Sequence, residues 1–358
     1  MKVGIVGASF ARAAYLPALR HVEGAEVVAL SSGRISSARN AASEFGIPAA
    51  YDDWQEMLDR HQPELVLIAT PTDLHAPITL AALERGAHVL CEKPTAMDAG
   101  EAKAMLDKAE ALGRVHMIDH ELRFNPNRQR VAEMIRNGDL GEIRHVNIAN
   151  IGASWANPAS RPKGDWWSLA EQGGGRLGAN GSHQVDMLRW WLGPVRSVVG
   201  QALTIIPDRA DKATGESWTA TADDLAYFTM EMVSGALAQV FMSGVAANNM
   251  GNLTQVFGSK GTVLLDNETE RLMYAKAGES FTDITADDPD AALPGLNKGI
   301  WNVSVLAALR ELTAAIREGR ALREGATFRD GLLNQQVLDA VKQSTTTRAW
   351  IDLPATIA

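Results

Sequence analysis

Two side chains in the sequence are placed where they could handle the oxygen and the proton of a substrate, Lys93 and His183. Lys93 follows the apolar run 87–91, which predicts a strand, and ligands bind at the carboxyl ends of the strands in a parallel sheet. An ammonium group there can polarise a carbonyl or stabilise an alkoxide. The alternative is a surface lysine at a strand end, which would have no chemical role.

His183 stands in the first turn of a helix predicted over 182–192. The helix dipole disfavours the imidazolium form at this point, so the ring would be available as a base. The pattern is equally compatible with a histidine that only packs or hydrogen bonds. Asp186 shares the same helix face three residues further on, where it could position the substrate or His183, or simply face solvent.

The segment after the first predicted strand, 3–6, has the features of a phosphate-binding turn. Gly7 stands where a dinucleotide fold needs its first glycine, whereas Ser9 and Arg12 replace the second and the third. Backbone N–H groups at the start of the next helix would hold the phosphates. We therefore predict cofactor contacts by Gly7, Ala8, Ser9, Phe10 and Ala11; the alternative is an ordinary glycine turn.

A second cofactor determinant is expected at the end of the second predicted strand, 26–30. The residues there are Ser31, Ser32, Gly33 and Arg34, and none of them is acidic. An NAD site usually places Asp or Glu at this point for the ribose hydroxyls, whereas arginine suits the 2′-phosphate of NADP. We therefore predict a preference for NADP(H) over NAD(H); the alternative for Arg34 is a solvated loop residue.

The elements around these residues alternate between apolar runs and amphipathic stretches through the first 120 residues. Strands are predicted at 3–6, 26–30, 65–69, 87–91 and 115–118, with helices between them. This alternation predicts a parallel, doubly wound Rossmann sheet with helices on both faces. A helix predicted over 10–21 contains Pro17, which predicts a kink or an interruption.

Beyond residue 120 the strand runs follow one another, at 143–151, 195–204, 225–232, 236–243, 253–257 and 262–265. Helices are predicted at 127–136, 182–192, 303–318 and 330–345. We therefore predict an α/β chain of two domains. Residues 1–120 form the Rossmann domain, and residues 121–358 form an α+β domain for substrate binding and oligomerisation, with a large, mostly antiparallel sheet.

The composition excludes several classes of protein. The chain has 358 residues, 46% of them hydrophobic, and a formal net charge of −9. The chain has no dense block of Lys and Arg of the kind that indicates nucleic-acid binding. No apolar run reaches the roughly 18 residues that span a bilayer. The N-terminus has no signal-peptide pattern, and the single cysteine, Cys91, excludes an intramolecular disulfide, so we expect a cytoplasmic protein. We see no metal-ligand spacing and expect no metal.

Several short motifs, in their order and spacing, resemble those of the Gfo/Idh/MocA family, which includes glucose–fructose oxidoreductase and inositol dehydrogenase. They are Thr70-Pro71-Thr72-Asp73-Leu74-His75, Glu92-Lys93-Pro94, Arg123-Phe124-x-Pro126, Gly138-x-x-Gly141-Glu142-Ile143, Gly173-Gly174-Gly175, Gly181-x-His183-x-x-Asp186 and Gly258-Ser259-Lys260-Gly261-Thr262. The resemblance covers essentially the whole chain.

The resemblance implies an NADP(H)-dependent oxidoreductase acting on a sugar, a cyclitol or a related hydroxyl or carbonyl compound. Lys93 would polarise the substrate oxygen and His183 would be the general acid/base. The expected cofactor contacts include Thr70, Pro71, Thr72, His75, Glu92, Lys93 and Pro94, with the Lys93–Pro94 bond cis. The expected substrate contacts are Lys93, Arg123, Trp166, Asn180, His183 and Asp186; for Trp166 a core or subunit-contact role is the alternative.

One position departs from the family. Dehydrogenases of this kind commonly carry an aspartate four residues before the histidine, where this chain has Ala179. Such an aspartate fixes the tautomer of the histidine and supports the imidazolium. Its absence leaves two other hypotheses about function open: a glycosidase with a tightly bound nicotinamide cofactor, and a non-catalytic NADP-binding regulator. The resemblance also implies a homodimer or homotetramer that pairs through the second domain's sheet.

Overall fold

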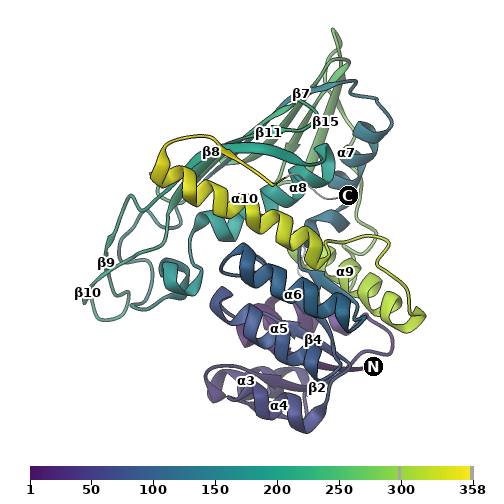
Figure 1. Ribbon diagram of the computed structural model, residues 1–358, viewed down its shortest axis with the longest axis vertical. Coiled ribbons are helices and arrows are strands. Elements are labelled where there is room, and N and C mark those ends of the chain that lie inside the picture. Colours follow the sequence, from purple (N-terminus) through teal and green to yellow (C-terminus); the bar gives the residue numbers. More distant parts are fainter. Residues whose placement is uncertain (297–299, 355–358) are drawn as a thin grey trace. The chain divides into compact units, whose positions relative to one another are not determined.

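The computed structural model describes residues 1–296 and 300–354, and the chain divides into two compact units (Figure 1). The first unit contains Met1–Asn125 and Asp288–Leu333; the second contains Pro126–Asp287 and the residues from Asn334 onward. The sequence-based boundary after residue 120 makes each domain one continuous segment. The structure differs, because an amphipathic segment late in the chain returns to the first unit.

The first unit is built on a parallel sheet of six strands in the order β3-β2-β1-β4-β5-β6. This is the strand order of a dinucleotide-binding fold, and the predicted doubly wound sheet is confirmed. The strands are β1 (Lys2–Val6), β2 (Glu26–Ser31), β3 (Ala50–Tyr51), β4 (Leu65–Ile68), β5 (His88–Cys91) and β6 (His116–Ile118).

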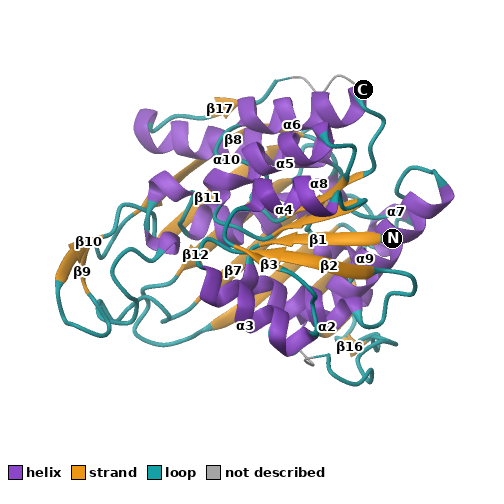
Figure 2. Cartoon of the chain, turned by 90° about the horizontal axis from the view of Figure 1, so that it is seen from below, coloured by secondary structure: helices purple, strands orange, loops and turns teal. Residues whose placement is uncertain are grey.

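Helices cover both faces of this sheet, which explains why β4 is a continuous apolar run. Leu65 and Leu67 belong to one hydrophobic cluster and Val66 and Ile68 to the other, because successive side chains of a strand point to opposite faces. Figure 2 shows α2, α3 and α9 on one side of β1 and α4, α5 and α6 on the other. Their bounds are α2 (Leu16–Leu19), α3 (Ile35–Phe45), α4 (Trp54–His61), α5 (His75–Glu84), α6 (Ala99–Ala111) and α9 (Ile300–Glu318).

The helix after β1 starts earlier than predicted and contains a π-helical turn. It consists of α1 (Ala8–Phe10), the π turn Ala11–Tyr15 and α2. The Leu16 N–H bonds to the carbonyl of Ala11, five residues back. The predicted interruption is therefore found, but it lies ahead of Pro17, which sits in the first turn of α2, where its missing N–H costs little.

The second unit carries a sheet of nine strands in the order β16-β15-β14-β13-β7-β12-β11-β8-β17. Every neighbouring pair is antiparallel except β12 and β7, so the predicted mostly antiparallel sheet is confirmed. The strands are β7 (Ile143–Ile151), β8 (Val195–Leu203), β11 (Leu225–Met232), β12 (Leu237–Ser243), β13 (Gly251–Gly258), β14 (Gly261–Asp266), β15 (Arg271–Lys276), β16 (Thr282–Asp283) and β17 (Ile351–Asp352); β9 (Asp208–Ala210) and β10 (Ser217–Thr219) form a separate pair.

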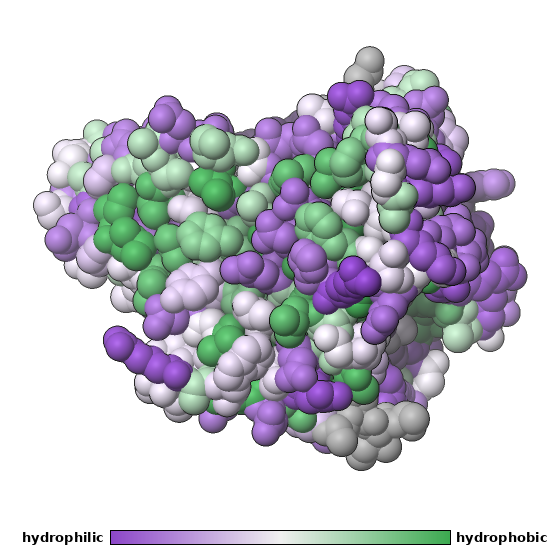
Figure 3. All heavy atoms as spheres, turned by 90° about the horizontal axis from the view of Figure 1, so that it is seen from above, coloured by the Kyte–Doolittle hydropathy of each residue, from purple (hydrophilic) through white to green (hydrophobic). Residues whose placement is uncertain are grey.

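Among residues 1–296 and 300–354, the helices that pack on the nine-stranded sheet lie on one of its faces. α7 (Pro126–Arg136), α8 (Ser182–Leu192) and the second-unit part of α10 (Phe328–Thr347) share one hydrophobic cluster with the alternate residues of the strands. The remaining residues form an open face, where Tyr227 pairs with Phe241 across β11 and β12, and Ala149 with Leu253 across β7 and β13. Figure 3 views the molecule from the side away from α8 and α10 and shows hydrophobic side chains gathered among hydrophilic ones.

Candidate active site

The glycine turn has the geometry that a phosphate cradle requires. Gly7 has a φ of 108°, and a Cβ built on it would lie 2.1 Å from the carbonyl oxygen of Ala69. Its N–H donates to the Ser31 carbonyl at 2.8 Å, which ties the turn to the end of β2. The helix begins immediately at Ala8, and the exposed Ser9 lies in its first turn. The first backbone N–H groups of a helix have no partners within it and attract anions.

The residues after β2 divide into a structural and an accessible part. Ser31 is buried and accepts the Gly7 N–H through its main chain. Ser32 is half-buried, whereas Gly33 and Arg34 are exposed, and Arg34 occupies the cap position ahead of α3. Arg12, which stands where the third glycine of the turn would be, is held in an ion pair by Glu44. Arg34 is therefore the predicted cofactor residue here whose charged group is accessible.

His75 has a structural position behind the predicted cofactor contacts. The side chain is buried, its Nδ1 lies 2.9 Å from the Pro94 carbonyl oxygen and its Nε2 lies 3.1 Å from that of Thr70. Burial lowers the pKa of His75 to about 4, so the ring is neutral and donates to one of the two carbonyls. The imidazole therefore links the loop at Thr70–Thr72 to the Lys93–Pro94 peptide, which is cis as expected.

Lys93 lies directly after β5 and is largely withdrawn from solvent. Its side chain is 14% exposed, and its Nζ lies 4.0 Å from Glu92 Oε2. A second bond joins the Lys93 N–H to the same carboxylate oxygen at 3.3 Å. Because a desolvated ammonium interacts more strongly with a charge or dipole than a hydrated one, this position suits the polarisation of a substrate oxygen.

Arg123 is used to hold the first unit together. It is buried, and its guanidinium donates to the Gly325 carbonyl at 3.2 Å and to Asp330 Oδ1 at 3.1 Å. These bonds tie the short helix Glu121–Phe124 to the returning segment. The substrate contact predicted for Arg123 would have to be made by a side chain that already has these partners.

In the second unit, the helix that carries His183 is longer than predicted. A π turn, Leu177–Gly181, runs directly into α8, and the Ser182 N–H bonds to the Leu177 carbonyl. His183 is 4% exposed and lies in the second turn of this continuous helix. The expectation that it occupies the first turn, with the full dipole effect on its ring, is therefore wrong. The carboxylate at the true helix start belongs to Asp223, whose Oδ2 accepts the Leu177 N–H at 2.8 Å.

Asp223 is one of the residues that the sequence did not reveal. Burial raises its pKa to about 6, against the lowering effect of the bonds from main-chain N–H groups. Gly175 has a φ of 113°, and a Cβ there would lie 2.2 Å from Asp223 Oδ1, so the glycine run makes room for this carboxylate. The signal in the sequence was the glycine run itself, but it did not indicate that Asp223 lies against it.

The other predicted substrate residues on this helix are already hydrogen bonded. Asn180 Oδ1 accepts from Arg176 at 3.0 Å, and Asp186 Oδ1 accepts from Asn334 at 2.8 Å. Asp186 is 2% exposed, so the alternative that it faces solvent is wrong. Trp166 is half-buried and stacks on Trp167 with ring centroids 4.2 Å apart. Either indole face of this pair that remains open could receive a sugar ring.

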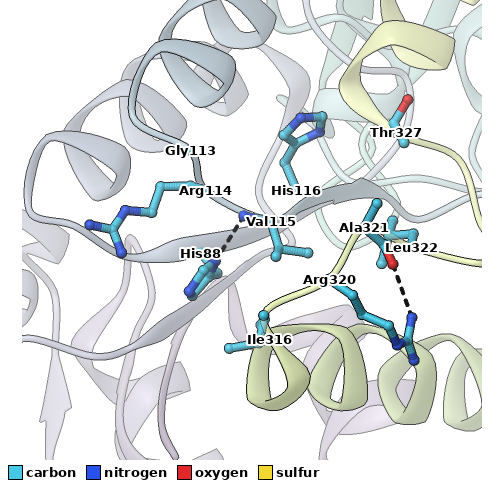
Figure 4. A pocket seen from close by; sticks show the side chains of 11 residues that line it. His88, Gly113, Arg114, Val115, His116, Ile316, Arg320, Ala321, Leu322 and Thr327 are labelled. Atoms are coloured by element: carbon cyan, nitrogen blue, oxygen red, sulfur yellow. Dashed lines mark hydrogen bonds between the residues drawn. The ribbon is translucent and has the colours of Figure 1, made fainter.

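A cavity of about 380 Å³ in the first unit is lined by none of these residues (Figure 4). It lies at the amino ends of β5 and β6, where His88 and His116 begin the two strands. His88 Nδ1 accepts the Val115 N–H at 2.9 Å and His116 Nδ1 accepts the Phe328 N–H at 3.0 Å. Ligands of parallel sheets bind at the carboxyl ends, so we assign this cavity no part in the candidate active site.

The described part of the chain contains neither a membrane-spanning helix nor a candidate metal-binding cluster. None of its helices is long and apolar enough to cross a membrane. Within residues 1–296 and 300–354, no group of three or more His, Cys, Asp or Glu side chains is arranged to hold a metal ion.

Two family models match the chain. One, described as an oxidoreductase family with an NAD-binding Rossmann fold, matches residues 1–120, and the other, described as the GFO/IDH/MocA C-terminal domain, matches residues 128–264. Together they span both the glycine turn and the helix of His183.

Individual proteins match over most or all of the chain. Levoglucosan dehydrogenase of Pseudarthrobacter phenanthrenivorans is 26% identical over 342 residues, which cover 88% of this chain and 87% of that protein. D-glucoside 3-dehydrogenase of Escherichia coli is 34% identical over 217 residues, 59% of this chain and 61% of that protein. The solved complex of levoglucosan dehydrogenase with NADH and levoglucosan superposes with a TM-score of 0.87 at 26% identity, over 99% of each chain.

Proposed function

Since the chain belongs to the Gfo/Idh/MocA oxidoreductase family, we propose that it transfers hydride between a nicotinamide cofactor and a carbinol or carbonyl carbon of a sugar or cyclitol. The observation that carries the proposal is Lys93, a largely buried ammonium at the carboxyl end of β5 in the nucleotide-binding unit. The names of the relatives, a levoglucosan dehydrogenase and a D-glucoside 3-dehydrogenase, support a sugar-like substrate.

The proposed reaction divides the work between two side chains. When bound, the nicotinamide supplies the acceptor or the donor of the hydride. In the oxidation direction His183 takes the hydroxyl proton, while the Lys93 ammonium stabilises the negative charge that develops on the substrate oxygen. In the reduction direction Lys93 polarises the carbonyl and His183 returns the proton. Gly7 and the first turn of the following helix hold the pyrophosphate.

The test is a screen of purified protein with NADP and NAD against anhydro-sugars, glucosides and cyclitols, followed by the absorbance of the reduced nicotinamide. We expect steady multiple turnover with at least one of these classes. If the cofactor binds tightly and a glucoside is cleaved without net reduction of the cofactor, the protein is a glycosidase with a tightly bound nicotinamide cofactor and not a dehydrogenase. Cofactor binding with neither reaction would replace it by the regulator.

We further propose that the cofactor is NADP(H) in preference to NAD(H). Arg34 is exposed at the start of α3, and no carboxylate stands in the run Ser31–Arg34 to repel a 2′-phosphate. The Arg34→Ala variant should lose about tenfold or more in NADPH affinity, the value of one charged hydrogen bond, while its NADH affinity changes little. Fluorescence titration measures both, and Arg39→Ala, further along α3, is the matched control. Equal losses for the two cofactors would exclude a 2′-phosphate contact.

We also propose that the chain forms a homodimer or homotetramer through the open face of the nine-stranded sheet. Tyr227, Phe241 and Leu253 are each more than a third exposed on this face, and the Tyr227 and Phe241 rings stack at 6.1 Å. Such an apolar row on a flat sheet is costly to leave in water. We expect Phe241→Glu to give a monomer in sedimentation equilibrium, whereas Phe281→Glu, next to the edge strand β16, keeps the oligomer. A monomeric wild-type protein at micromolar concentration would contradict the proposal.

A further inference from the structure

Three ionisable side chains meet in the interior of the first unit, and the proposed reaction uses none of them. Tyr15 Oη lies 2.9 Å from Glu92 Oε1 and 2.9 Å from Asp119 Oδ2. Tyr15 and Asp119 are fully buried and Glu92 is 7% exposed. Tyr15 ends the π turn after the phosphate cradle, while Glu92 and Asp119 follow β5 and β6. We call these three residues the buried acid cluster.

The geometry of the buried acid cluster requires a proton on one carboxyl group. A phenol has one hydrogen and can donate to only one of two oxygens that lie at the same short distance. If both carboxyls were ionised, the second would place a carboxylate oxygen against the phenol oxygen with no hydrogen between them, at a site buried from solvent. If one carboxyl is neutral, its O–H can donate to the other carboxyl, with which it shares a side-chain hydrogen bond, or to Tyr15 Oη, while Tyr15 donates to the ionised carboxyl.

The charges around the cluster also favour one proton on the two carboxyls. Lys93 faces Glu92, with Nζ 4.0 Å from Oε2. Glu121 adds negative charge at Asp119. Burial, together with the charges of Glu92 and Asp119, raises the pKa of the Cys91 thiol well above its usual range, so this thiol is neutral. Two ionised carboxyls, with Glu121 beside them, would leave excess negative charge in the interior against the single ammonium of Lys93, and a proton on one carboxyl lessens that excess.

We propose that Glu92 and Asp119 hold a single proton between them, bridged by the Tyr15 hydroxyl, so that the cluster presents one negative charge to Lys93. The directions of the pKa shifts agree with this arrangement. Burial raises the pKa of Glu92, but the neighbouring Lys93 lowers it again. Burial raises the pKa of Asp119 well above its usual range, and the charges of Glu92 and Glu121 raise it further. The proton therefore resides mainly on Asp119 and the negative charge on Glu92.

The consequence for Lys93 rests on the proposed function. An ammonium opposed by one carboxylate keeps a positive potential that a substrate oxygen can use, whereas a second negative charge beside it weakens that potential. Tyr15 and Asp119 are thus positioning residues that act through Glu92 and Lys93. Loss of the shared proton at alkaline pH should lower kcat/KM even though neither residue touches the substrate.

The shared proton can be detected without any assay of activity. A neutral carboxyl has a C=O stretching band separate from the bands of carboxylates and of the main chain. Infrared spectra of the full-length protein at pH 8 should show this band in the wild type, a loss of the band in Asp119→Asn, and no change in Asp107→Asn, whose surface carboxylate pairs with Lys103. A folded wild-type protein without the band at pH 8 would overturn the proposal.

Stability gives an independent measurement with a defined sign. Because the pKa of Asp119 is raised in the folded state, folding binds a proton above the usual range of aspartate. That stabilisation is complete below the unfolded pKa and is lost as the pH rises toward the folded value. Relative to Asp119→Asn, the unfolding equilibrium constant of the wild type should rise by up to tenfold per pH unit above about pH 5. A constant ratio between the two proteins from pH 5 to pH 9 would count against a shared proton.

Kinetics then test the link to Lys93. In Asp119→Asn the pH at which kcat/KM falls on the alkaline side should shift by about one unit or more. The reason is that the cluster can no longer gain a second negative charge when the pH rises. Tyr15→Phe, which removes the bridge, should also displace it. The matched Tyr51→Phe should keep the wild-type profile, since the Tyr51 hydroxyl bonds to His61 and takes no part in the buried acid cluster. An infrared band with an unmoved kinetic profile would overturn the link to Lys93. If the band is present but the protein turns over no substrate, the proposed function is contradicted and the shared proton is not.

Discussion

The Lys93→Met variant is expected to lose about 10²- to 10³-fold in kcat/KM, the range seen when one preorganised donor to a developing oxyanion is removed. Methionine keeps most of the volume and the apolar stem of the side chain, so the packing after β5 should survive. The Lys93 side chain is 14% exposed, and the electrostatic effect of its ammonium group is therefore poorly replaced by water. The affinity for the reduced cofactor should change by less than about threefold, because the proposed phosphate contacts lie at the Gly7 turn and not at Lys93.

Two controls separate a chemical role of Lys93 from a structural one. Lys103→Met removes a surface lysine that pairs with Asp107 and should keep full activity. In Lys93→Ala, small alkylamines added to the buffer should restore part of kcat, because an ammonium can then occupy the space of the missing side chain. If Lys93→Met retained kcat and raised only KM, the residue would bind substrate without assisting the chemical step.

The sequence predicted the first unit well because its signals are local. Five of the six strands of the parallel sheet lie in short apolar runs, which are typical of strands covered by helices on both faces. The two-residue strand β3 (Ala50–Tyr51) has no such run and was not predicted. The motifs around Lys93 and His183 then predicted the family, which is confirmed. The return of 288–333 was not predicted, because the apolar stripe of a helix does not say which sheet it will cover.

The buried acid cluster could not be predicted from the sequence, for a different reason. Tyr15 lies 77 residues from Glu92 and 104 residues from Asp119 along the chain. Within the sequence Tyr15 is one aromatic residue in a helix, and nothing marks it as the neighbour of two carboxyls. The two π turns also have no sequence signature, although each lies beside a candidate functional residue, as such turns often do.

The candidate substrate residues show how a motif can predict importance without predicting the role. Arg123 and Asp186 belong to motifs that suggested substrate contacts, and both are buried with protein partners. Polar groups in the interior need such partners, so a motif residue can be indispensable to the architecture of a site that it does not touch. His75 is a similar case, since its ring joins two loops of the nucleotide-binding unit.

The His183→Gln variant is expected to lose about 10²- to 10⁴-fold in kcat, the usual contribution of a positioned general acid/base. Glutamine fits a buried helical position and can still hydrogen bond, but it cannot exchange a proton. His145→Gln is the matched control, because His145 is exposed and stacks on Phe257 on the open face of the second unit's sheet. It should leave kcat unchanged.

The pH dependence decides whether His183 acts as the base. For the oxidation direction, the wild-type kcat/KM should fall at acidic pH as the imidazole takes up a proton, and the residual activity of His183→Gln should lack this acidic limb. Ala179 stands where the resemblance implies an aspartate that supports an imidazolium. Introducing the aspartate with Ala179→Asp should shift the acidic limb upward in pH, since a nearby carboxylate favours the imidazolium. If His183→Gln kept the acidic limb, another group would be the base and His183 would serve to position the substrate.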